Sequence, residues 1–430
     1  MHRDVNRSET AVEPNTGPRW LRRNRTLLLI FFLAVLLRAI PNIWLEWKEP
    51  GWHASNINEI EFYYDDVARS LILGEGFVHS VNPRSSTSEY KFSPGTPFHF
   101  VPPLYAWLLG IEYFVFGPNV FLAKLVQCFL DAFACLLVYR IGVRMLDRRT
   151  ALIAATLYEI YPLAIVVSTR LYYQTLLNLA LCWIVLCMAA RVTVRNGIWT
   201  GIAVGVSALA KPITLPLILI VPAIKMLETI RVRATIRPHV SWLLAFAIAF
   251  ALTLAPWTIR NYIVFDRFIP VQDGAGVVLI QGSREAYVDL DVVSLRREYG
   301  ADFEIAEGEF ASTALSNHWT HLVSNPVDYF RFLGKKFLLA WYNTEGKDKN
   351  AMVLLVQLPF IVAALFGLIA WFPLWTRIPN VYVVGLILYI SALQVALFPL
   401  VRYTLAVMPL VMLPAALAIN KVLCRRWGVL

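Results

Sequence analysis

The sequence predicts an all-α polytopic membrane protein, on the basis of its composition, its hydrophobic stretches and the distribution of its charges. Of the 430 residues, 58% are hydrophobic and only 16% are charged, and the mean hydropathy is +0.58. These values lie far from those of average soluble domains. Because a membrane-spanning helix needs about 20 apolar residues, the hydrophobic stretches predict about ten crossings.

The first hydrophobic stretch, "TLLLIFFLAVLLRAIPNIW", follows an arginine-rich tail. It lacks the small-residue cleavage site of a signal peptide, so we expect it to be retained as the first helix. The stretches 102–116 and 328–342 barely reach the length of a span and predict helices in the membrane interface. The predicted spans cover residues 26–44, 118–139, 151–168, 174–190, 197–210, 213–224, 240–259, 351–372, 380–400 and 404–420.

Basic residues concentrate on one side of this topology. That side holds 20 of the 39 Lys and Arg but only 5 of the 29 acids. By the positive-inside rule it is cytoplasmic, with both termini, and the net charge of +10 indicates contact with anionic lipid and not with nucleic acid. The predicted divisions are a basic tail, a transmembrane domain, a C-terminal tail and two long outer loops, at residues 1–25, 26–424, 425–430, 45–101 and 260–328.

The first outer loop contains a cluster of carboxylates in "NEIEFYYDDVARSLILGEGF". If residues 60–73 are helical, Glu61, Asp65 and Arg69 follow one another on one face, and Gly74 ends the helix. One interpretation is a solvated amphipathic helix whose acids complement its N-terminus. The other is a catalytic site, since like charges four residues apart destabilise an isolated helix. Four acids fall within eight positions: Glu59, Glu61, Asp65 and Asp66.

Cations occur at the predicted outer ends of distant spans. Each is consistent with an anchor that snorkels to the surface, but together they predict an anion site on the face that carries the acids. Carboxylates beside cations suit displacement of a phosphate leaving group, in which the carboxylate takes a proton and the cations stabilise the phosphate. The four cations are Arg170, Lys211, Arg260 and Arg402.

Six stretches of the sequence carry a resemblance to a known family: "YYDDVARSLILGEGF", "VPPLYAWLLGIEYFVFGPN", "RMLDRRTALIAATLYEIYPLAIVVSTRLYYQTL", "GIAVGVSALAKPITLPL", "LAPWTIRNYIVFDRFIPVQDGAG" and "VRYTLAVMPLVMLPAALA". With these stretches the chain resembles a bacterial member of the GT-C glycosyltransferases, specifically the protein O-mannosyltransferase and aminoarabinose-transferase group. The resemblance implies a GT-C-like bundle with interfacial helices in a large first outer loop. It also implies transfer of a sugar, with inversion, from a polyprenyl-phosphate donor to a lipid, glycan or protein hydroxyl outside the bacterial cytoplasmic membrane, without a cofactor.

The resemblance also implies site residues. The family has an Asp-Glu pair four and three residues before the tyrosine that matches Tyr64, and here these positions hold Ile60 and Glu61. The catalytic carboxylate is therefore Glu61 or the neighbouring Glu59, with Asp65 as a third choice.

The remaining carried-over positions concern substrate binding. Tyr64 itself is assigned there with the four cations. Val101 replaces a lysine that some relatives place before two prolines, and His99 lies close by. Gln174 takes the place of an acid in the second outer loop. These departures leave the donor sugar and the phosphate contacts open.

Other polar residues are assigned to structural roles or left open. His318 and His321 in "HWTH" have no obvious third ligand, so no essential metal is expected. Asp131 and Glu159 lie inside predicted spans, where ionisable groups commonly mark function. Glu159 could line a cavity or pair with Lys124 or another helix.

Two further classes of function fit the sequence. A transporter or flippase of lipid-linked sugars could use the same charges, although it would more often show inverted repeats and charges near the midplane. A non-catalytic protein with a GT-C-like fold is the other alternative. Charges concentrated in the outer loops favour chemistry at the membrane surface.

Overall fold

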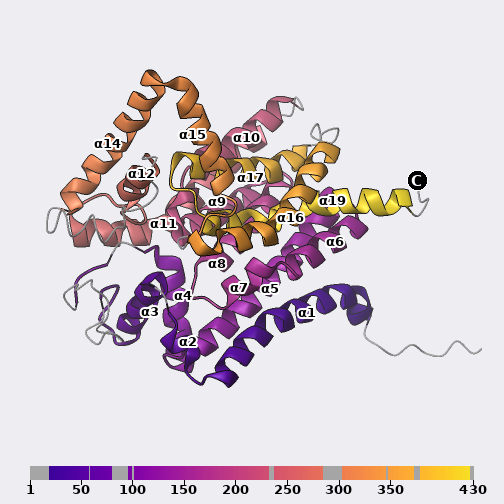
Figure 1. The fold of residues 1–430 in the computed structure, drawn as a ribbon, viewed down its shortest axis with the longest axis horizontal. Helices are drawn as coiled ribbons and strands as arrows, with labels where there is room; N and C mark the ends of the chain where they lie inside the picture. The colour runs from indigo at the N-terminus through magenta and orange to yellow at the C-terminus, as the bar shows by residue number, and fades with distance from the viewer. Residues whose placement is uncertain are drawn as a thin grey trace, which may run out of the picture.

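The computed structural model shows a bundle of helices (Figure 1). Among the described residues, β-pairing is limited to one isolated bridge between Val78 and Pro97. The structure describes residues 19–57, 59–79, 95–98, 101–231, 237–283, 303–344, 347–371 and 378–426.

Each helix predicted from hydrophobicity has an observed counterpart. The first half of the chain forms α1 (Arg19–Lys48), α2 (Trp52–Ser55), α3 (Glu59–Ile72), α4 (Pro103–Phe116), α5 (Val120–Met145), α6 (Arg148–Glu159), α7 (Pro162–Ser168), α8 (Gln174–Met188), α9 (Val194–Ala210) and η1 (Pro212–Thr214). The second half forms α10 (Leu217–Arg231), α11 (Arg237–Phe265), α12 (Ala275–Ser283), α14 (Phe303–Ser324), α15 (Pro326–Leu339), η3 (Lys347–Lys349), α16 (Asn350–Trp371), α17 (Ile378–Ala396), α18 (Val401–Thr404), η5 (Leu405–Val407) and α19 (Met408–Arg426).

One predicted span is broken. The stretch 151–168 forms α6 and α7, which are bent by 52° relative to each other. Pro162 is the first residue of α7 and has no backbone N–H to donate into the preceding turn, so the α-helical ladder stops there. The chain changes direction at this break, and Arg170, one of the predicted site residues, follows the end of α7.

The structure supports a multi-pass membrane protein. Among the described residues, six helices are long and apolar enough to cross a membrane, and a seventh is added if the bent pair is one span. Three shorter apolar helices accompany them, so the total of about ten crossings stays a prediction. The six are Arg25–Lys48, Val120–Met145, Pro212–Arg231, Arg237–Phe265, Asn350–Trp371 and Val401–Cys424.

Three glycines allow α9 and α11 to pack closely. Gly197, Gly201 and Gly205 are spaced by four residues and share one face of α9. A Cβ atom would lie 2.4 Å from the Trp242 carbonyl oxygen at Gly197, and 2.3 Å from that of Phe246 at Gly201. No side chain fits at these distances, so the small residues set the helix separation, as in other membrane bundles.

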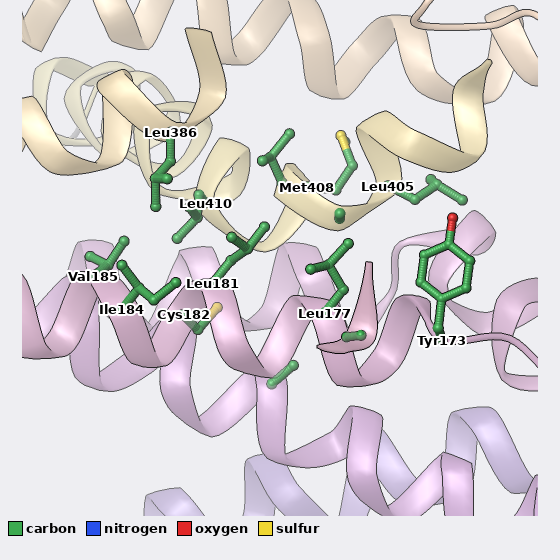
Figure 2. Packing of buried hydrophobic residues seen from close by; sticks show 14 of the residues in the cluster. Tyr173, Leu177, Leu181, Cys182, Ile184, Val185, Leu386, Leu405, Met408 and Leu410 are labelled. Atoms are coloured by element: carbon green, nitrogen blue, oxygen red, sulfur yellow. The ribbon is translucent and has the colours of Figure 1, made fainter. Parts of the chain in front are cut away.

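The core forms where α8 packs against α17, η5 and α19, which lie side by side in the close view (Figure 2). The packing brings the segment before α8 next to the segment before α19, although about 230 residues separate them in the sequence. Arg402 in α18 therefore lies near the start of α8. The buried side chains at this contact are Tyr173, Leu177, Leu181, Cys182, Ile184, Val185, Leu386, Leu405, Met408 and Leu410.

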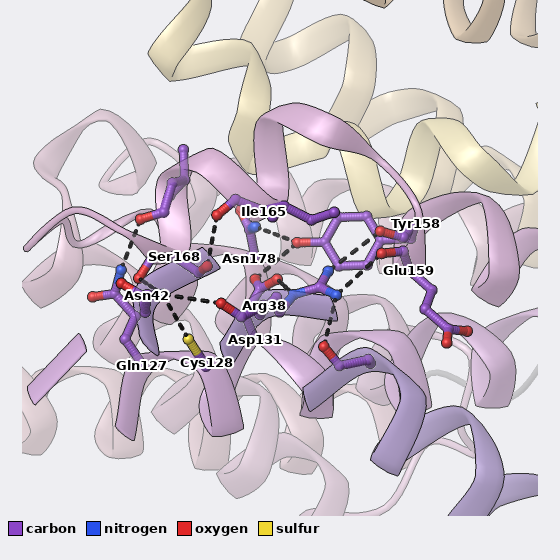
Figure 3. A network of polar contacts seen from close by, with 12 residues as sticks. Arg38, Asn42, Gln127, Cys128, Asp131, Tyr158, Glu159, Ile165, Ser168 and Asn178 are labelled. Carbon is purple, nitrogen blue, oxygen red and sulfur yellow. Dashed lines mark hydrogen bonds and ion pairs between the residues drawn. The ribbon is translucent and has the colours of Figure 1, made fainter. Parts of the chain in front are cut away.

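A buried ion pair joins α1, α5 and α6 (Figure 3). Arg38 Nε lies 2.6 Å from Asp131 Oδ2, and the guanidinium also donates to the carbonyl oxygens of Tyr158 and Glu159 at 3.3 and 3.2 Å. The Tyr158 hydroxyl donates to the other oxygen of Asp131 at 2.9 Å. Asp131, an ionisable group inside a span, thus has a structural role: its ion pair stabilises the break between α6 and α7.

Candidate active site

Helix α3 carries the acidic cluster predicted for the first outer loop. It ends before Gly74, whose φ of 77° suits glycine, close to the predicted end. Glu61, Asp65 and Asp66 are all buried, so the solvated amphipathic helix is not the observed arrangement. The side chain of Glu59 lies outside the described part of the structure, although its backbone begins α3. Buried carboxylates need partners, and their partners differ.

Asp65 is held by two neighbours. Arg69, one turn later on α3, donates from Nε to Asp65 Oδ2 at 2.8 Å, and the Tyr113 hydroxyl of α4 donates to Oδ1. Burial alone would lower the pKa of Arg69, but its hydrogen bond with Asp65 raises that pKa above its ordinary value. Asp65 therefore belongs to a clamp between α3 and α4.

Asp66 lies beside the chain that follows α3. Its Oδ2 is 3.1 Å from His79 Nδ1. Ser70, one turn further along α3, donates its hydroxyl toward the carbonyl oxygens of Gly76 and Val78 at 3.0 and 2.8 Å. This side of α3 fixes the path of residues 76–79.

Glu61 faces a cation from a distant part of the chain. Its Oε1 lies 3.7 Å from Arg170 Nη1, in the segment between α7 and α8. Glu61 is fully buried, whereas the Arg170 side chain is 33% exposed. An opposite charge at this distance favours the ionised carboxylate, which is the form that accepts a proton.

The backbone of Arg170 is fixed by Gln127 of α5. The Gln127 amide donates to the carbonyl oxygens of Val167 and Arg170 at 3.0 and 2.6 Å. Its own carbonyl accepts from the Tyr105 hydroxyl of α4 at 2.8 Å. One side chain therefore connects α4, α5 and the segment that presents Arg170 to Glu61.

Lys124 of α5 is a further cation at this site. Its side chain is fully buried, and its Nζ has no hydrogen-bond acceptor among the described residues. Nζ lies 5.8 Å from the centre of the Trp52 ring and interacts electrostatically with Glu61 and Arg170. Sequence reasoning considered Lys124 only as a partner of Glu159, although a lysine inside a predicted span was signal enough to add it to the site.

A second cluster lies next to Tyr64, one turn after Glu61 on α3. The buried Tyr64 ring packs edge-on against Tyr105 at 4.9 Å, and burial raises the pKa of Tyr64. The hydroxyl also interacts electrostatically with Arg402 of α18. Because residues three apart share a helix face, Glu61 and Tyr64 point toward the same side of α3.

Lys211 and Arg402 meet around tyrosine rings. Lys211 Nζ lies 5.1 Å from the ring centre of Tyr173 and 5.9 Å from that of Tyr403, and the Arg402 guanidinium lies 5.1 Å from the Tyr403 ring. Such cation–π contacts hold the cations without neutralising them. Gln174, at the start of α8, is buried beside Tyr173, and the Gln174 Oε1 and Tyr173 hydroxyl are buried without hydrogen-bond partners among the described residues.

Arg260 contacts the backbone of the first outer loop. The guanidinium donates to the carbonyl oxygens of Phe77 and Phe98 at 2.9 and 3.3 Å, and it lies 4.9 Å from the Trp257 ring. Arg260 thus attaches the first loop to α11. His99, the residue after Phe98, lies outside the described residues.

The histidines of "HWTH" contact neighbours on α15. His318 Nδ1 lies 3.4 Å from the Tyr329 hydroxyl, and His321 Nε2 lies 3.4 Å from Asp328 Oδ2. Within the described ranges no group of three or more His, Cys, Asp and Glu side chains is placed to hold a metal ion. The expectation that no metal is essential stays a prediction.

Comparison with known proteins finds one matching family model and several solved structures of similar fold. A family model described as dolichyl-phosphate-mannose-protein mannosyltransferase matches residues 100–259, which include α4 to α10 and most of α11. No curated protein matches the chain.

Three solved structures are similar to the chain. The archaeal oligosaccharyltransferase AglB from Archaeoglobus fulgidus, in complex with an inhibitory peptide and a dolichol-phosphate, is 15% identical with a TM-score of 0.55, covering 94% of this chain and 51% of that chain. An Archaeoglobus fulgidus oligosaccharyltransferase tethered to an acceptor peptide is 15% identical with a TM-score of 0.56, covering 95% and 51%. ArnT from Cupriavidus metallidurans, bound to undecaprenyl phosphate, is 13% identical with a TM-score of 0.48, covering 95% and 61%.

The fold assignment rests on the two archaeal structures. The chain spans about half the length of these relatives, and at 15% identity the likeness concerns the fold. It extends over nearly all of this chain, and the family model matches its central part independently. The resemblance predicted from the motifs is confirmed at the level of the fold: the chain has a GT-C-like fold, similar to that of the two archaeal oligosaccharyltransferases.

Proposed function

We propose that the protein is a membrane glycosyltransferase that moves a sugar from a polyprenyl-phosphate donor to an acceptor hydroxyl on the outer face of the bacterial cytoplasmic membrane. The observation that carries the proposal is the pairing of buried Glu61 with Arg170, one helical turn from the tyrosine and cation cluster around Tyr64. The bound dolichol-phosphate of the archaeal relative supports a lipid-phosphate donor. The charge distribution supports cytoplasmic termini.

The proposed reaction is a single displacement. Glu61 accepts the proton of the acceptor hydroxyl while the hydroxyl oxygen forms a bond to the anomeric carbon. The bond between that carbon and the phosphate oxygen breaks, and polyprenyl phosphate leaves as an anion. Attack opposite the leaving group inverts the anomeric carbon.

Glu61 is the preferred base among the three candidates. Asp65 already accepts from Arg69 and Tyr113, so its oxygens are occupied by the clamp between α3 and α4. Glu59 stays the alternative that the family alignment leaves open. Arg170 places a positive charge 3.7 Å from Glu61 and lies at the more exposed side of the pair.

Lys211 and Arg402 are proposed to stabilise the departing phosphate. Their contacts with the Tyr173 and Tyr403 rings leave the cationic charge available to an anion. Tyr64 and Gln174 border the same cluster and are proposed to position the donor. Arg260 is proposed to order the first loop over the site, and His99 stays a proposed substrate-binding residue.

Turnover by the purified protein in nanodiscs tests this function. A panel of polyprenyl-phosphate sugars is offered with Glu61→Gln, Glu59→Gln and the double variant. We expect Glu61→Gln to lower kcat by about 100-fold or more, the usual contribution of a general base. Glu309→Gln, at an exposed position, is the control.

Full activity in both single variants and in the double variant would remove the assignment of the base. Movement of a lipid-linked sugar across the bilayer without transfer would favour the transporter or flippase alternative. Neither activity would favour a non-catalytic GT-C-like protein.

A further inference from the structure

Lys124 has an unusual environment for a buried cation. It is fully buried in the second turn of α5, and its ammonium group has no acceptor among the described residues. An ammonium group inside a protein normally donates to carboxylates or carbonyls, because burying it without such partners costs several kcal/mol. The acceptor of Lys124 is therefore expected to come from a bound molecule.

His53 of α2 provides a second polar atom of the same kind. Its Nε2 lies 2.9 Å from the Asn42 carbonyl oxygen, which can only accept, so Nε2 carries the hydrogen. Burial lowers the pKa of His53 and favours the neutral ring. Its Nδ1 is then an acceptor, and it is buried without a partner among the described residues. A buried donor and a buried acceptor thus occur together where α2 packs on α5.

The described charged groups around Lys124 leave its ammonium group without a hydrogen-bonded counter-ion. Lys124 interacts electrostatically with the carboxylates of Glu61, Glu46 and Asp65 and with the guanidinium of Arg170, but among the described residues none accepts a hydrogen bond from Nζ. An oxyanion beside Lys124 would supply that acceptor. Because it would lie near Glu61, its carrier would present other groups, including hydroxyls, to the proposed base.

This region differs from the cluster assigned to the donor phosphate. Lys211 and Arg402 lie around the Tyr403 ring, and Arg402 interacts electrostatically with Tyr64, whereas Lys124 and Arg170 are associated with Glu61. One lipid phosphate occupies one of these cation pairs. The other pair is then available to the second substrate.

We propose that Lys124 binds an oxyanion of the acceptor, a phosphate or carboxylate, next to the hydroxyl that Glu61 deprotonates. The acceptor is therefore an anionic molecule. This inference rests on the proposed function for the identity of the second substrate, but binding alone can test it.

The experiment measures binding to the full-length protein in phosphatidylcholine nanodiscs saturated with undecaprenyl phosphate. The probes are glycerol 3-phosphate and glycerol, and calorimetry gives their affinities. We expect glycerol 3-phosphate to bind about 10-fold to 100-fold more tightly than glycerol, as a hydrogen bond to a charged group predicts. Lys124→Met should abolish this difference, and Lys124→Arg should keep most of it.

The matched variant is Arg402→Met. It should weaken binding of undecaprenyl phosphate, measured without the glycerol probes, while Lys124→Met changes that affinity less than about 2-fold. Equal binding of both glycerol probes, or unchanged glycerol 3-phosphate binding in Lys124→Met, would overturn the proposal. Weaker undecaprenyl phosphate binding in Lys124→Met would also overturn it, because Lys124 would then serve the donor.

Two further measurements keep the outcome interpretable. Thermal unfolding shows whether Lys124→Met folds, and Lys124→Gln replaces it if it does not. If no donor supports turnover, the proposed function fails while the binding difference can still be present. If turnover is robust and neutral acceptors react as well as anionic ones, this inference fails alone.

Discussion

Two buried clusters of charge in this protein are built differently. Around Arg38, the guanidinium donates to Asp131 and to carbonyl oxygens at the end of α6, and the second oxygen of Asp131 accepts from Tyr158. Around Glu61, Arg170 lies at 3.7 Å with a partly exposed side chain, and Lys124 has no acceptor among the described residues. The Arg38 cluster joins α1 and α5 to the end of α6, and the Glu61 cluster joins α3 to the segment after α7.

The difference separates a structural cluster from a candidate site. A buried polar network contributes to stability only when its members are satisfied, which describes the Arg38 cluster. Polar atoms left without partners are costly, and they persist where a bound molecule supplies the partner. The Arg38 cluster fixes the bend between α6 and α7, and the Glu61 cluster uses Arg170, which follows that bend.

The largest effect is expected from breaking the satisfied cluster. Arg38→Met leaves Asp131 charged and buried without its partner, which should lower the free energy of unfolding by about 3–5 kcal/mol. Chemical or thermal unfolding in nanodiscs measures the loss. Arg38→Met combined with Asp131→Leu should recover part of it, because the unpaired charge is removed. A stability equal to that of the unaltered protein in Arg38→Met would contradict the structural role of this pair.

A smaller effect, on activity, is expected at the Glu61 cluster. Arg170→Met should lower kcat by about 10-fold to 100-fold, because it removes the positive charge that lies 3.7 Å from the proposed base Glu61. Its effect on stability should be smaller than that of Arg38→Met, because the Arg170 side chain is 33% exposed and the ion pair is longer, at 3.7 Å. Turnover and thermal unfolding are measured on the same preparation.

Arg267→Gln is the matched control for Arg170→Met. Arg267 also forms an ion pair with a carboxylate, at 3.0 Å from Asp273, and its side chain is 43% exposed. It lies outside both clusters, so kcat should stay unchanged. A large loss of stability in Arg170→Met with unchanged kcat would mean that the Glu61 cluster is structural, like the Arg38 cluster.

The helices were predictable because their signals are local. Apolar runs, and prolines and glycines at their ends, predicted α3 at 60–73 and the interfacial helices near 102–116 and 328–342, close to where they are observed. The bend between α6 and α7 was missed, although Pro162 was visible, because proline inside an apolar run also occurs in continuous membrane helices. α14 lacks a long apolar run, and so it was not predicted.

The candidate site was only partly predictable because its contacts are long-range. The motif resemblance and the charges selected Glu61 and Arg170, but nothing in the sequence pairs two residues 109 positions apart. Arg260 was grouped with the other cations because it lies at the predicted outer end of α11, yet it donates to backbone carbonyls of the first loop. From the sequence, Lys124 was considered only as a partner of Glu159. Its actual neighbours become known only once α1, α2 and α5 are packed.

A third buried cation sharpens the comparison, because it is intermediate between the two clusters. Lys336 of α15, outside the membrane-spanning segments, is fully buried and donates to the Gly282 carbonyl oxygen at 2.7 Å, and burial lowers its pKa to about 7. In the unfolded chain the pKa is near 10.4, so the unfolded state binds more protons between pH 7 and pH 10. The free energy of unfolding should therefore rise with pH in this window, by up to about 1 kcal/mol per pH unit.

Lys336→Met should raise stability at pH 7 and remove this pH dependence, because the variant has no proton to lose. Unfolding of the protein between pH 7 and pH 9 measures both effects, and Lys335→Met, at the exposed neighbouring position, should leave the slope unchanged. An unchanged slope in Lys336→Met would mean that one carbonyl oxygen is enough to keep a buried ammonium charged. Lys124 lacks even that acceptor among the described residues. If a buried ammonium group stays charged so easily, the burial of Lys124 would be weaker support for a bound anion.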